Sequence, residues 1–164
     1  MDDAMNHVVL KPVGIAGLIT PWNLPLYLLS WKIAPAIVMG NTVVAKPSEL
    51  TPLTANLLSQ TLDEIDFPAG VVNIVHGLGS EAGQAIVEDP KINLISFTGG
   101  TLTGKKVAET AAPMFKKLSL ELGGKNATII LDDANLDASI PEIARSAFMN
   151  QGQVCLCGSR ILIS

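Results

Sequence analysis

Charged residues, aromatic residues and cysteines are all scarce in this 164-residue sequence, and each shortage argues against a class of protein. Charged residues make up 16% of the chain, the formal net charge is −4, and basic residues never occur in runs longer than two. This composition argues against nucleic acid or an anionic membrane as a partner. Aromatic residues make up 4%, which is few for a sandwich of sheets and ordinary for helices over parallel strands. Almost half of the residues are apolar, so we expect a globular chain with a real core.

The two cysteines, Cys155 and Cys157, stand two residues apart, with no histidine or third cysteine beside them. This spacing is poor for a metal site and the number is too small for a disulfide framework, so no metal is expected. Reduced thiols are typical of intracellular proteins, and we expect a cytoplasmic location. The first ten residues carry acids and no apolar core, so a signal peptide is not expected. The most apolar stretch, 24–39, is shorter than the roughly 20 residues that a bilayer requires, so no membrane partner is expected.

Short apolar runs alternate with longer helical patterns along the chain. This alternation predicts βαβ units and an α/β fold with a doubly wound parallel sheet. We expect Thr51 and Ser80 to cap helices and Pro35 to kink one. The expected strands are 13–19, 42–45, 71–75, 94–97, 117–121 and 127–131, and the expected helices are 24–39, 51–64, 80–87, 101–112 and 136–148. In such sheets ligands bind beyond the carboxyl ends of the strands, where polar residues and glycines gather in this sequence.

Cys155 is the first candidate for chemistry. It follows a helical pattern and a polar turn and precedes a short apolar run (160–163), which predicts that it lies on a connection. A thiol is the strongest nucleophile among the side chains at neutral pH, because part of it is already thiolate. The alternative is a buried structural cysteine, since free cysteines are among the most buried residues.

Glu121 and Asn23 each end a predicted strand. A carboxylate at the mouth of an apolar sheet can have its pKa raised by desolvation and act as a general base. The alternative for Glu121 is a solvated acid at a strand end. Asn23 offers a neutral amide that can stabilise an oxyanion, or it caps the helix expected at Leu24.

Two further features point to a nucleotide. Lys46 and Glu49 end the second predicted strand and can both bond ribose hydroxyls, although a surface ion pair is the alternative. The glycines of segments 77–83 and 99–104 follow strands and open helices, where a pyrophosphate can approach backbone N–H groups. The alternative for each glycine segment is a tight turn that simply needs glycine.

Five segments occur together along the chain: ITPWNLPL (19–26), KPSELTP (46–52), SFTGGTLTG (96–104), LELGGK (120–125) and NQGQVCLCGSR (150–160). In their order and spacing they resemble the aldehyde dehydrogenase superfamily, whose members oxidise aldehydes to acids with NAD(P). The resemblance covers the chain from about Lys11 to its end. Within the superfamily, the cysteine neighbourhood and segment 22–35 favour the 2-aminomuconic and 2-hydroxymuconic semialdehyde dehydrogenases, which act on small semialdehydes.

The resemblance implies a role for each matching residue. Cys155 is the implied nucleophile, Glu121 the general base, Asn23 the oxyanion donor together with the backbone N–H of Cys155, and Lys32 an aid to proton transfer. The reaction would pass through a cysteine thiohemiacetal and a thioester that Glu121 helps to hydrolyse. The implied cofactor is NAD, and NADP is disfavoured because Glu49 would repel a 2′-phosphate. The implied cofactor-binding residues are Thr20, Pro21, Trp22, Asn23, Lys46, Ser48, Glu49, Gly79, Gly83, Phe97, Thr98, Gly99, Gly100, Thr101, Glu121, Leu122 and Gly123.

The chain also departs from the family. Gly100 stands where the family often has serine, which removes one hydroxyl contact to the pyrophosphate, and Cys157 lies two residues past the nucleophile. The chain is much shorter than family members, so we expect residues 1–124 to be part of an NAD-binding domain and residues 125–164 the start of a catalytic domain. The partner is expected to be a small aldehyde, and the full-length parent a homo-oligomer. The alternative is a catalytically incomplete fragment that only binds NAD or packs with a full-length subunit.

Overall fold

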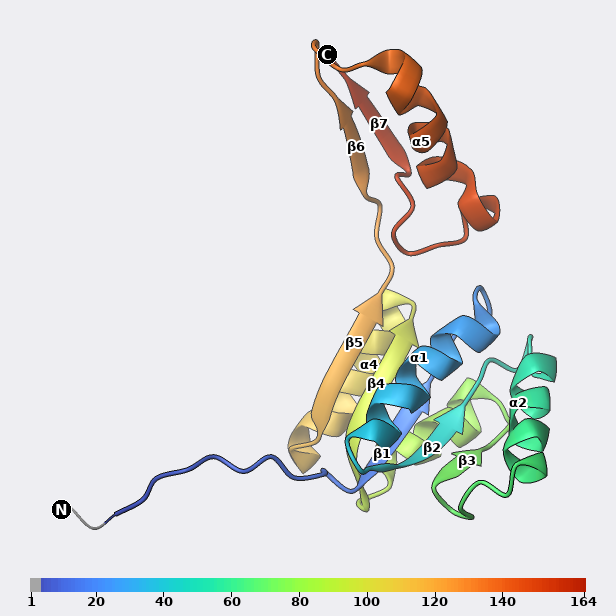
Figure 1. Ribbon diagram of the computed structural model, residues 1–164, viewed down its shortest axis with the longest axis vertical. Coiled ribbons are helices and arrows are strands. Elements are labelled where there is room, and N and C mark those ends of the chain that lie inside the picture. Colours follow the sequence, from blue (N-terminus) through green and yellow to red (C-terminus); the bar gives the residue numbers. More distant parts are fainter. Residues whose placement is uncertain (1–3) are drawn as a thin grey trace.

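The computed structural model describes residues 4–164, and its largest part is a parallel sheet of five strands (Figure 1). The strand order is β3-β2-β1-β4-β5, so the chain runs outward from β1 to β3 and then returns to the other side of β1. All neighbouring pairs are parallel. This order confirms the predicted doubly wound α/β fold. The strands are β1 (Ile15–Ile19), β2 (Thr42–Lys46), β3 (Val72–Ile74), β4 (Ile92–Gly99) and β5 (Lys117–Leu122).

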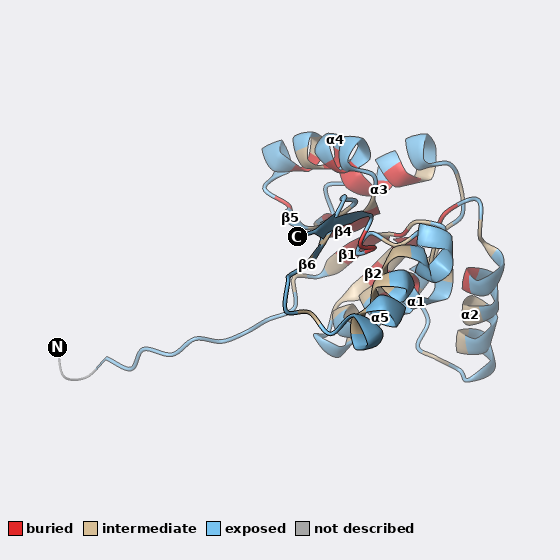
Figure 2. Ribbon diagram, turned by 90° about the horizontal axis from the view of Figure 1, so that it is seen from above, coloured by how far each residue is buried: buried red, intermediate tan, exposed pale blue. Residues whose placement is uncertain are grey.

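Helices cover both faces of this sheet (Figure 2). Helices α1 (Pro25–Val38) and α2 (Leu53–Glu64) pack on one face, and α3 (Gln84–Glu88) and α4 (Thr101–Ala111) pack on the other. Successive side chains of a strand point to opposite faces. Ala16 and Leu18 of β1 therefore join the core under α1 and α2, while Ile15 and Ile19 join the core under α3 and α4. Burial on both faces explains why β1, at the centre of the sheet, is apolar along its whole length.

A second, smaller unit follows the five-stranded sheet and is joined to it by residues 123–126 (Figure 1). Strands β6 (Ala127–Ile130) and β7 (Arg160–Ile163) form a parallel pair, and α5 (Leu136–Phe148) with the 3₁₀ turn η3 (Met149–Gly152) connects them. The side chain of Asn135 caps α5 by accepting a hydrogen bond from the N–H of Ala138 (3.2 Å).

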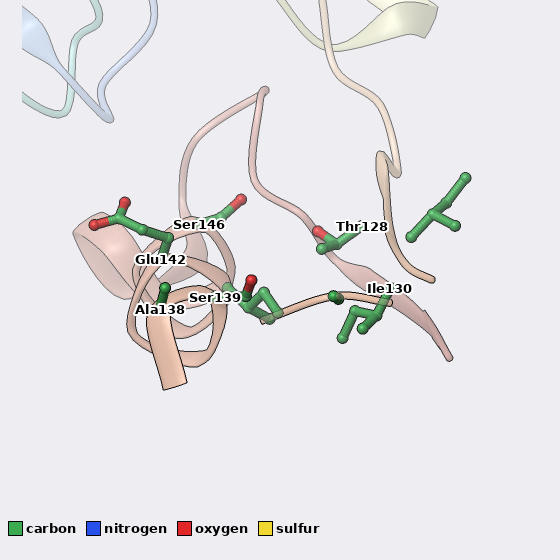
Figure 3. A pocket seen from close by; sticks show the side chains of 9 residues that line it. Thr128, Ile130, Ala138, Ser139, Glu142 and Ser146 are labelled. Carbon is green, nitrogen blue, oxygen red and sulfur yellow. The ribbon is translucent and has the colours of Figure 1, made fainter. Parts of the chain in front are cut away.

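The interior of this second unit is loosely filled. Figure 3 shows side chains of α5, among them Ala138 and Ser139, and side chains of β6, among them Ile130, around a cavity of about 380 Å³. No residue of α5 or β7 is buried. The second unit therefore has little apolar core of its own among the residues that the structure describes.

Some local predictions are wrong. Ser80 caps no helix, because it lies inside a π-helical turn, η1 (Gly79–Gly83), that leads into α3. Helix α2 begins at Leu53 with Pro52 in the N-cap position, so Thr51 is not the cap, and its hydroxyl has no hydrogen-bond partner. Strand β4 extends beyond the predicted 94–97 at both ends, because it pairs with β1 on one side and β5 on the other.

Helix α1 continues through Pro35 to Val38. No helix within residues 4–164 combines the length and the apolar character needed to cross a membrane.

Candidate active site

A groove of about 710 Å³ lies between α1, one face of β4 and β5, and the segment that follows α5. Lys32 of α1, Glu121 of β5 and Cys155 all line this groove, although they come from distant parts of the sequence. Cys155 and Glu121 are both exposed. The structure therefore brings a thiol, a carboxylate and an amine to one groove, which runs along the face of the parallel sheet beside α1.

The floor of the groove is a polar patch on two adjacent strands. Ser96 and Thr98 of β4 stand opposite Ser119 and Glu121 of β5, respectively. All four line the groove, because alternate residues of a strand share a face. Thr98 is buried, and its hydroxyl oxygen has no hydrogen-bond partner among the described residues. A buried hydroxyl without a partner is unusual in a protein and fits a site that receives a ligand or water.

Lys32 is tied to this floor. Its Nζ donates a hydrogen bond of 2.7 Å to Oγ of Ser96. Burial of the amine lowers the pKa of Lys32 from its ordinary value of 10.5, and the nearby negative charge of Glu121 partly opposes that shift. A lysine with a lowered pKa exchanges its proton more readily near neutral pH than a solvated lysine does.

Asn23 lies in the turn between β1 and α1, where its side chain meets the segment that carries the thiol. The side-chain Nδ2 of Asn23 donates to the backbone carbonyl of Gln153 (2.7 Å). The backbone carbonyl of Asn23 accepts a hydrogen bond from the side-chain Nδ2 of Asn150 (2.9 Å). Helix α1 has Leu24 at its N-cap and no side-chain cap, so the alternative that Asn23 caps this helix is wrong. An amide nitrogen carries two N–H groups, and only one of them is used in the bond to Gln153. Asn23 itself is not among the residues that line the groove, although its neighbour Leu24 is.

The two cysteines have different surroundings. Cys155 is exposed, whereas Cys157 is buried and its thiol lies 3.9 Å from the carbonyl of Met149 as a weak donor. The alternative of a buried structural cysteine therefore describes Cys157 and not Cys155.

Lys46 and Glu49 form an ion pair in which the lysine side chain is buried. Nζ of Lys46 donates to Oε2 of Glu49 (2.9 Å) and to the carbonyl of Pro47 (3.1 Å), and the Lys46 side chain is 3% exposed. The hydrogen bond from Lys46, followed by a bond to the Glu49 backbone, holds the pKa of Glu49 below its ordinary value. The alternative of a surface ion pair therefore fits Glu49 only, since Lys46 lies inside the fold.

Space for a ligand lies next to this pair. An added Cβ at Gly79 or at Gly100 would meet no atom within 4 Å, and one at Gly83 would lie 3.6 Å from Cδ of Lys46. Gly100 is the N-cap of α4, so unpaired N–H groups of that helix face open space. The space at η1 beside Lys46 fits a sugar, and the open space at the N-terminus of α4 fits a phosphate.

The other predicted cofactor residues gather at the same edge of the sheet, with one exception. Phe97 is the exception because its ring is buried in the apolar core, on the face of the sheet that α3 and α4 cover and that Lys46 shares. Four of the five buried polar residues of the described chain belong to the predicted set: Thr20, Lys46, Ser48 and Thr98. The remaining members occupy the β1–α1 turn (Pro21, Trp22, Asn23), the β2–α2 loop (Glu49), η1 (Gly79, Gly83), the β4–α4 junction (Gly99, Gly100, Thr101) and the end of β5 (Glu121, Leu122, Gly123). No group of three or more His, Cys, Asp or Glu among residues 4–164 is placed to hold a metal ion.

The model of the aldehyde dehydrogenase family matches residues 1–164 of this sequence. The chain belongs to the aldehyde dehydrogenase family. Human 2-aminomuconic semialdehyde dehydrogenase is 59% identical to it over 159 residues, which are 97% of this chain and 33% of the human protein. The 2-hydroxymuconic semialdehyde dehydrogenase of Pseudomonas sp. (strain CF600) is 49% identical over 161 residues, which are 98% of this chain and 33% of that protein. This chain therefore spans about a third of the length of these relatives.

Solved aldehyde dehydrogenases share the fold. The NAD⁺ complex of the aldehyde dehydrogenase from Bacillus cereus has a TM-score of 0.91 and 46% sequence identity, over 93% of this chain and 31% of that chain. The resemblance stated from the five sequence segments, including its leaning toward the muconic semialdehyde dehydrogenases, is confirmed.

Sequence reasoning missed several polar residues of this candidate site. Ser96 and Ser119 line the groove, and two-residue spacing from Thr98 and Glu121 was the signal that could have revealed them. Asn126 and Asn150 were missed as well. Their side chains donate hydrogen bonds to the backbone carbonyls of Cys155 and Asn23, which lie 29 and 127 residues away along the chain. Periodicity carries no signal for contacts of that kind.

Proposed function

We propose that this chain carries the nucleophile and the general base of an NAD-dependent enzyme that oxidises an aldehyde to a carboxylic acid. The observation that supports this proposal most directly is that Cys155 and Glu121 line one groove on the face of the sheet. Lys32 lines the same groove and responds to the charge of Glu121. A nucleophile and an acid–base pair in one cleft suit acyl chemistry.

The proposed mechanism begins with attack of the Cys155 thiolate on the aldehyde carbon. The second N–H of the Asn23 amide and the backbone N–H of Cys155 would bind the developing oxyanion, and one such donor contributes about 3–4 kcal/mol. NAD, when bound, supplies the acceptor for the hydride that leaves the carbon attached to sulfur, so a thioester remains on Cys155. Glu121 then removes a proton from the water that attacks this thioester, and the Cys155 thiolate departs with the acid released. Lys32 assists in clearing the proton from Glu121.

We propose residues 1–124 as part of the NAD-binding domain and residues 125–164 as the start of the catalytic domain, with the boundary between the two sheets. Lys46 and Glu49 would hold the adenosine ribose, and the N-terminus of α4 at Gly100 would hold the pyrophosphate. NAD is favoured over NADP, because the bond from Lys46 keeps Glu49 ionised and its charge repels a 2′-phosphate.

The proposed substrate is a small conjugated semialdehyde of the muconic type. The names of the relatives at 59% and 49% identity support this class. The rings of Tyr27 and Trp31 also support it, since both line the groove, are exposed and meet edge to face with centroids 5.1 Å apart. Flat aromatic surfaces favour a flat, conjugated ligand.

The test follows NADH formation from 2-hydroxymuconic semialdehyde. Cys155→Ala should abolish NADH formation, because no thiohemiacetal can form. Glu121→Gln should retain one rapid burst of NADH per Cys155 and slow the later turnovers by about 10²–10⁴-fold, the usual contribution of a general base. Equal loss of the burst and the later turnovers would contradict the role of Glu121 in thioester hydrolysis.

A second candidate function is that this chain only binds NAD or packs with a full-length subunit. It is favoured by the length of the chain, about a third of its relatives, and by the exposure of β7 throughout. The thiol distinguishes the two functions: NAD that slows alkylation of Cys155, in a chain that never forms NADH, would support the second candidate.

A further inference from the structure

The chemistry proposed above depends on groups from two separate units. Glu121 and Asn23 belong to the five-stranded unit, whereas Cys155 belongs to the unit of β6, β7 and α5. The connection 123–126 forms no helix or strand and begins with Gly123 and Gly124. Such a connection does not hold two units at a fixed separation, so contacts between the units must do so.

Two hydrogen bonds join the units within residues 4–164, and they form a reciprocal pair. The Asn23 side chain donates to the Gln153 carbonyl (2.7 Å), and the Asn150 side chain donates to the Asn23 carbonyl (2.9 Å). The first bond sets the orientation of the Asn23 amide, because a flipped amide would bring two oxygens together. Oδ1 of Asn23 is then buried without a partner, which is the cost of presenting the N–H side to Gln153.

The turn that supplies these partners is strained. Asn150 (φ 49°), Gln151 (φ 59°) and Gly152 (φ 74°) are three successive residues in the left-handed region. A non-glycine residue pays roughly 1–2 kcal/mol there, although asparagine tolerates it better than glutamine does. A turn of this kind persists only when its surroundings determine it. In this chain the turn directs the backbone carbonyl of Gln153, two residues before Cys155, toward the side chain of Asn23.

A hydrogen bond also holds the peptide on the C-terminal side of Cys155. Nδ2 of Asn126, at the end of the connection, donates to the carbonyl of Cys155 itself (2.9 Å). The peptide that follows Cys155 is thus bonded to the connection, while the peptide that precedes Val154 is bonded to the β1–α1 turn.

We propose that Asn126 and Asn150 are positioning residues, which together with Asn23 form an asparagine clamp (Asn23, Asn126 and Asn150). The clamp fixes the backbone N–H of Cys155 relative to the side-chain N–H of Asn23, and these are the two oxyanion donors of the proposed function, on which this role rests. No other hydrogen bond of residues 4–164 links the two donors across the units.

The test compares two glycine variants in the full chain. Asn150→Gly removes the clamp bond and still accepts the left-handed backbone, because glycine adopts it freely. Gln151→Gly, its neighbour, also removes one side-chain amide and relieves strain but touches no clamp bond. Hydrogen–deuterium exchange of residues 150–158 should speed up about tenfold in Asn150→Gly and remain as in the parent chain in Gln151→Gly.

Turnover of the semialdehyde gives the second measurement. In Asn150→Gly kcat should fall about 10–100-fold while KM changes less than about twofold, because misplacement of the oxyanion donors affects the transition state and not substrate binding. Active sites are counted by alkylation of Cys155, so loss of folded chain is not mistaken for loss of kcat. Asn126→Ala is the second variant should Asn150→Gly fail to fold, with the same expected changes.

Equal exchange rates and equal kcat in the two glycine variants would overturn the clamp. A parent chain that oxidises no aldehyde would instead overturn the proposed function, and the exchange measurement alone would then decide whether the clamp holds the nucleophile segment.

Discussion

Gly100 offers a direct test of how the chain holds a pyrophosphate. It is the N-cap of α4 with φ −69° and ψ 145°, an extended conformation that any residue adopts, and an added Cβ would meet nothing within 4 Å. Serine therefore fits at this position without strain. It would add a hydroxyl that can cap the helix or bond a phosphate oxygen, which is the contact that this chain lacks relative to many family members.

The expected magnitudes follow from this geometry. One added hydrogen bond contributes about 1 kcal/mol, so Gly100→Ser should tighten NAD binding roughly fivefold in a calorimetric titration. Gly100→Ala is the matched control, since it adds the Cβ without the hydroxyl and should not tighten binding. Serine should also exceed alanine in thermal stability by about 1 kcal/mol, or roughly 2–4 °C, as an N-cap. Weaker binding in Gly100→Ser, or equal gains with alanine and serine, would refute the placement of the pyrophosphate at this helix.

Three further predictions concern the sheet, the lysine and the ribose contact. Gly17→Ala should destabilise the chain by about 1–3 kcal/mol in urea unfolding, because its Cβ would lie 2.5 Å from the side chain of Ile86, whereas Gly79→Ala, in open space, should cost nothing. Stability of the parent chain should rise with pH between the lowered pKa of Lys32 and 10.5, since the unfolded state binds more protons there, and Lys32→Met should flatten that rise; an unchanged slope would contradict the buried amine. Glu49→Gln should reduce the preference for NAD over NADP about tenfold in titrations, and an unchanged preference would remove Glu49 from the ribose site.

The fold was predictable because its main signal is local. Strands buried on both faces must be apolar throughout, and β1 (IAGLI) shows this directly. Alternation with helices then leaves few topologies. The helix caps at Thr51 and Ser80 were not predictable in the same way, because the π-helical turn and the start of α2 depend on how the loops pack and not on the capping residue alone.

Single residues of the site were predictable from residue type and position at strand ends. Glu121 and Lys46 end strands of one parallel sheet, and the carboxyl ends of such strands meet at one edge. Phe97 shows the limit of that reasoning. It also lies near a strand end and shares a face of the sheet with Lys46, yet its ring fills the apolar core, so position at a strand end does not by itself separate a ligand contact from a core residue.

The arrangement of the thiol against the base was harder to predict, for a physical reason. Cys155 and Glu121 stand in different units joined by a connection with two glycines, so no local pattern relates their positions. The bond that relates them, from Asn23 to Gln153, spans 130 residues, and its acceptor is a backbone carbonyl whose direction depends on three left-handed residues. Every residue has a backbone carbonyl, so the residue type at position 153 does not indicate this bond. Only one of the three left-handed residues is a glycine, so the sequence gives little indication of the turn either. The proposed catalytic geometry therefore depends on side-chain amides that bond backbone atoms, and substitutions at Asn126 and Asn150 should alter it without changing any group proposed to touch the aldehyde.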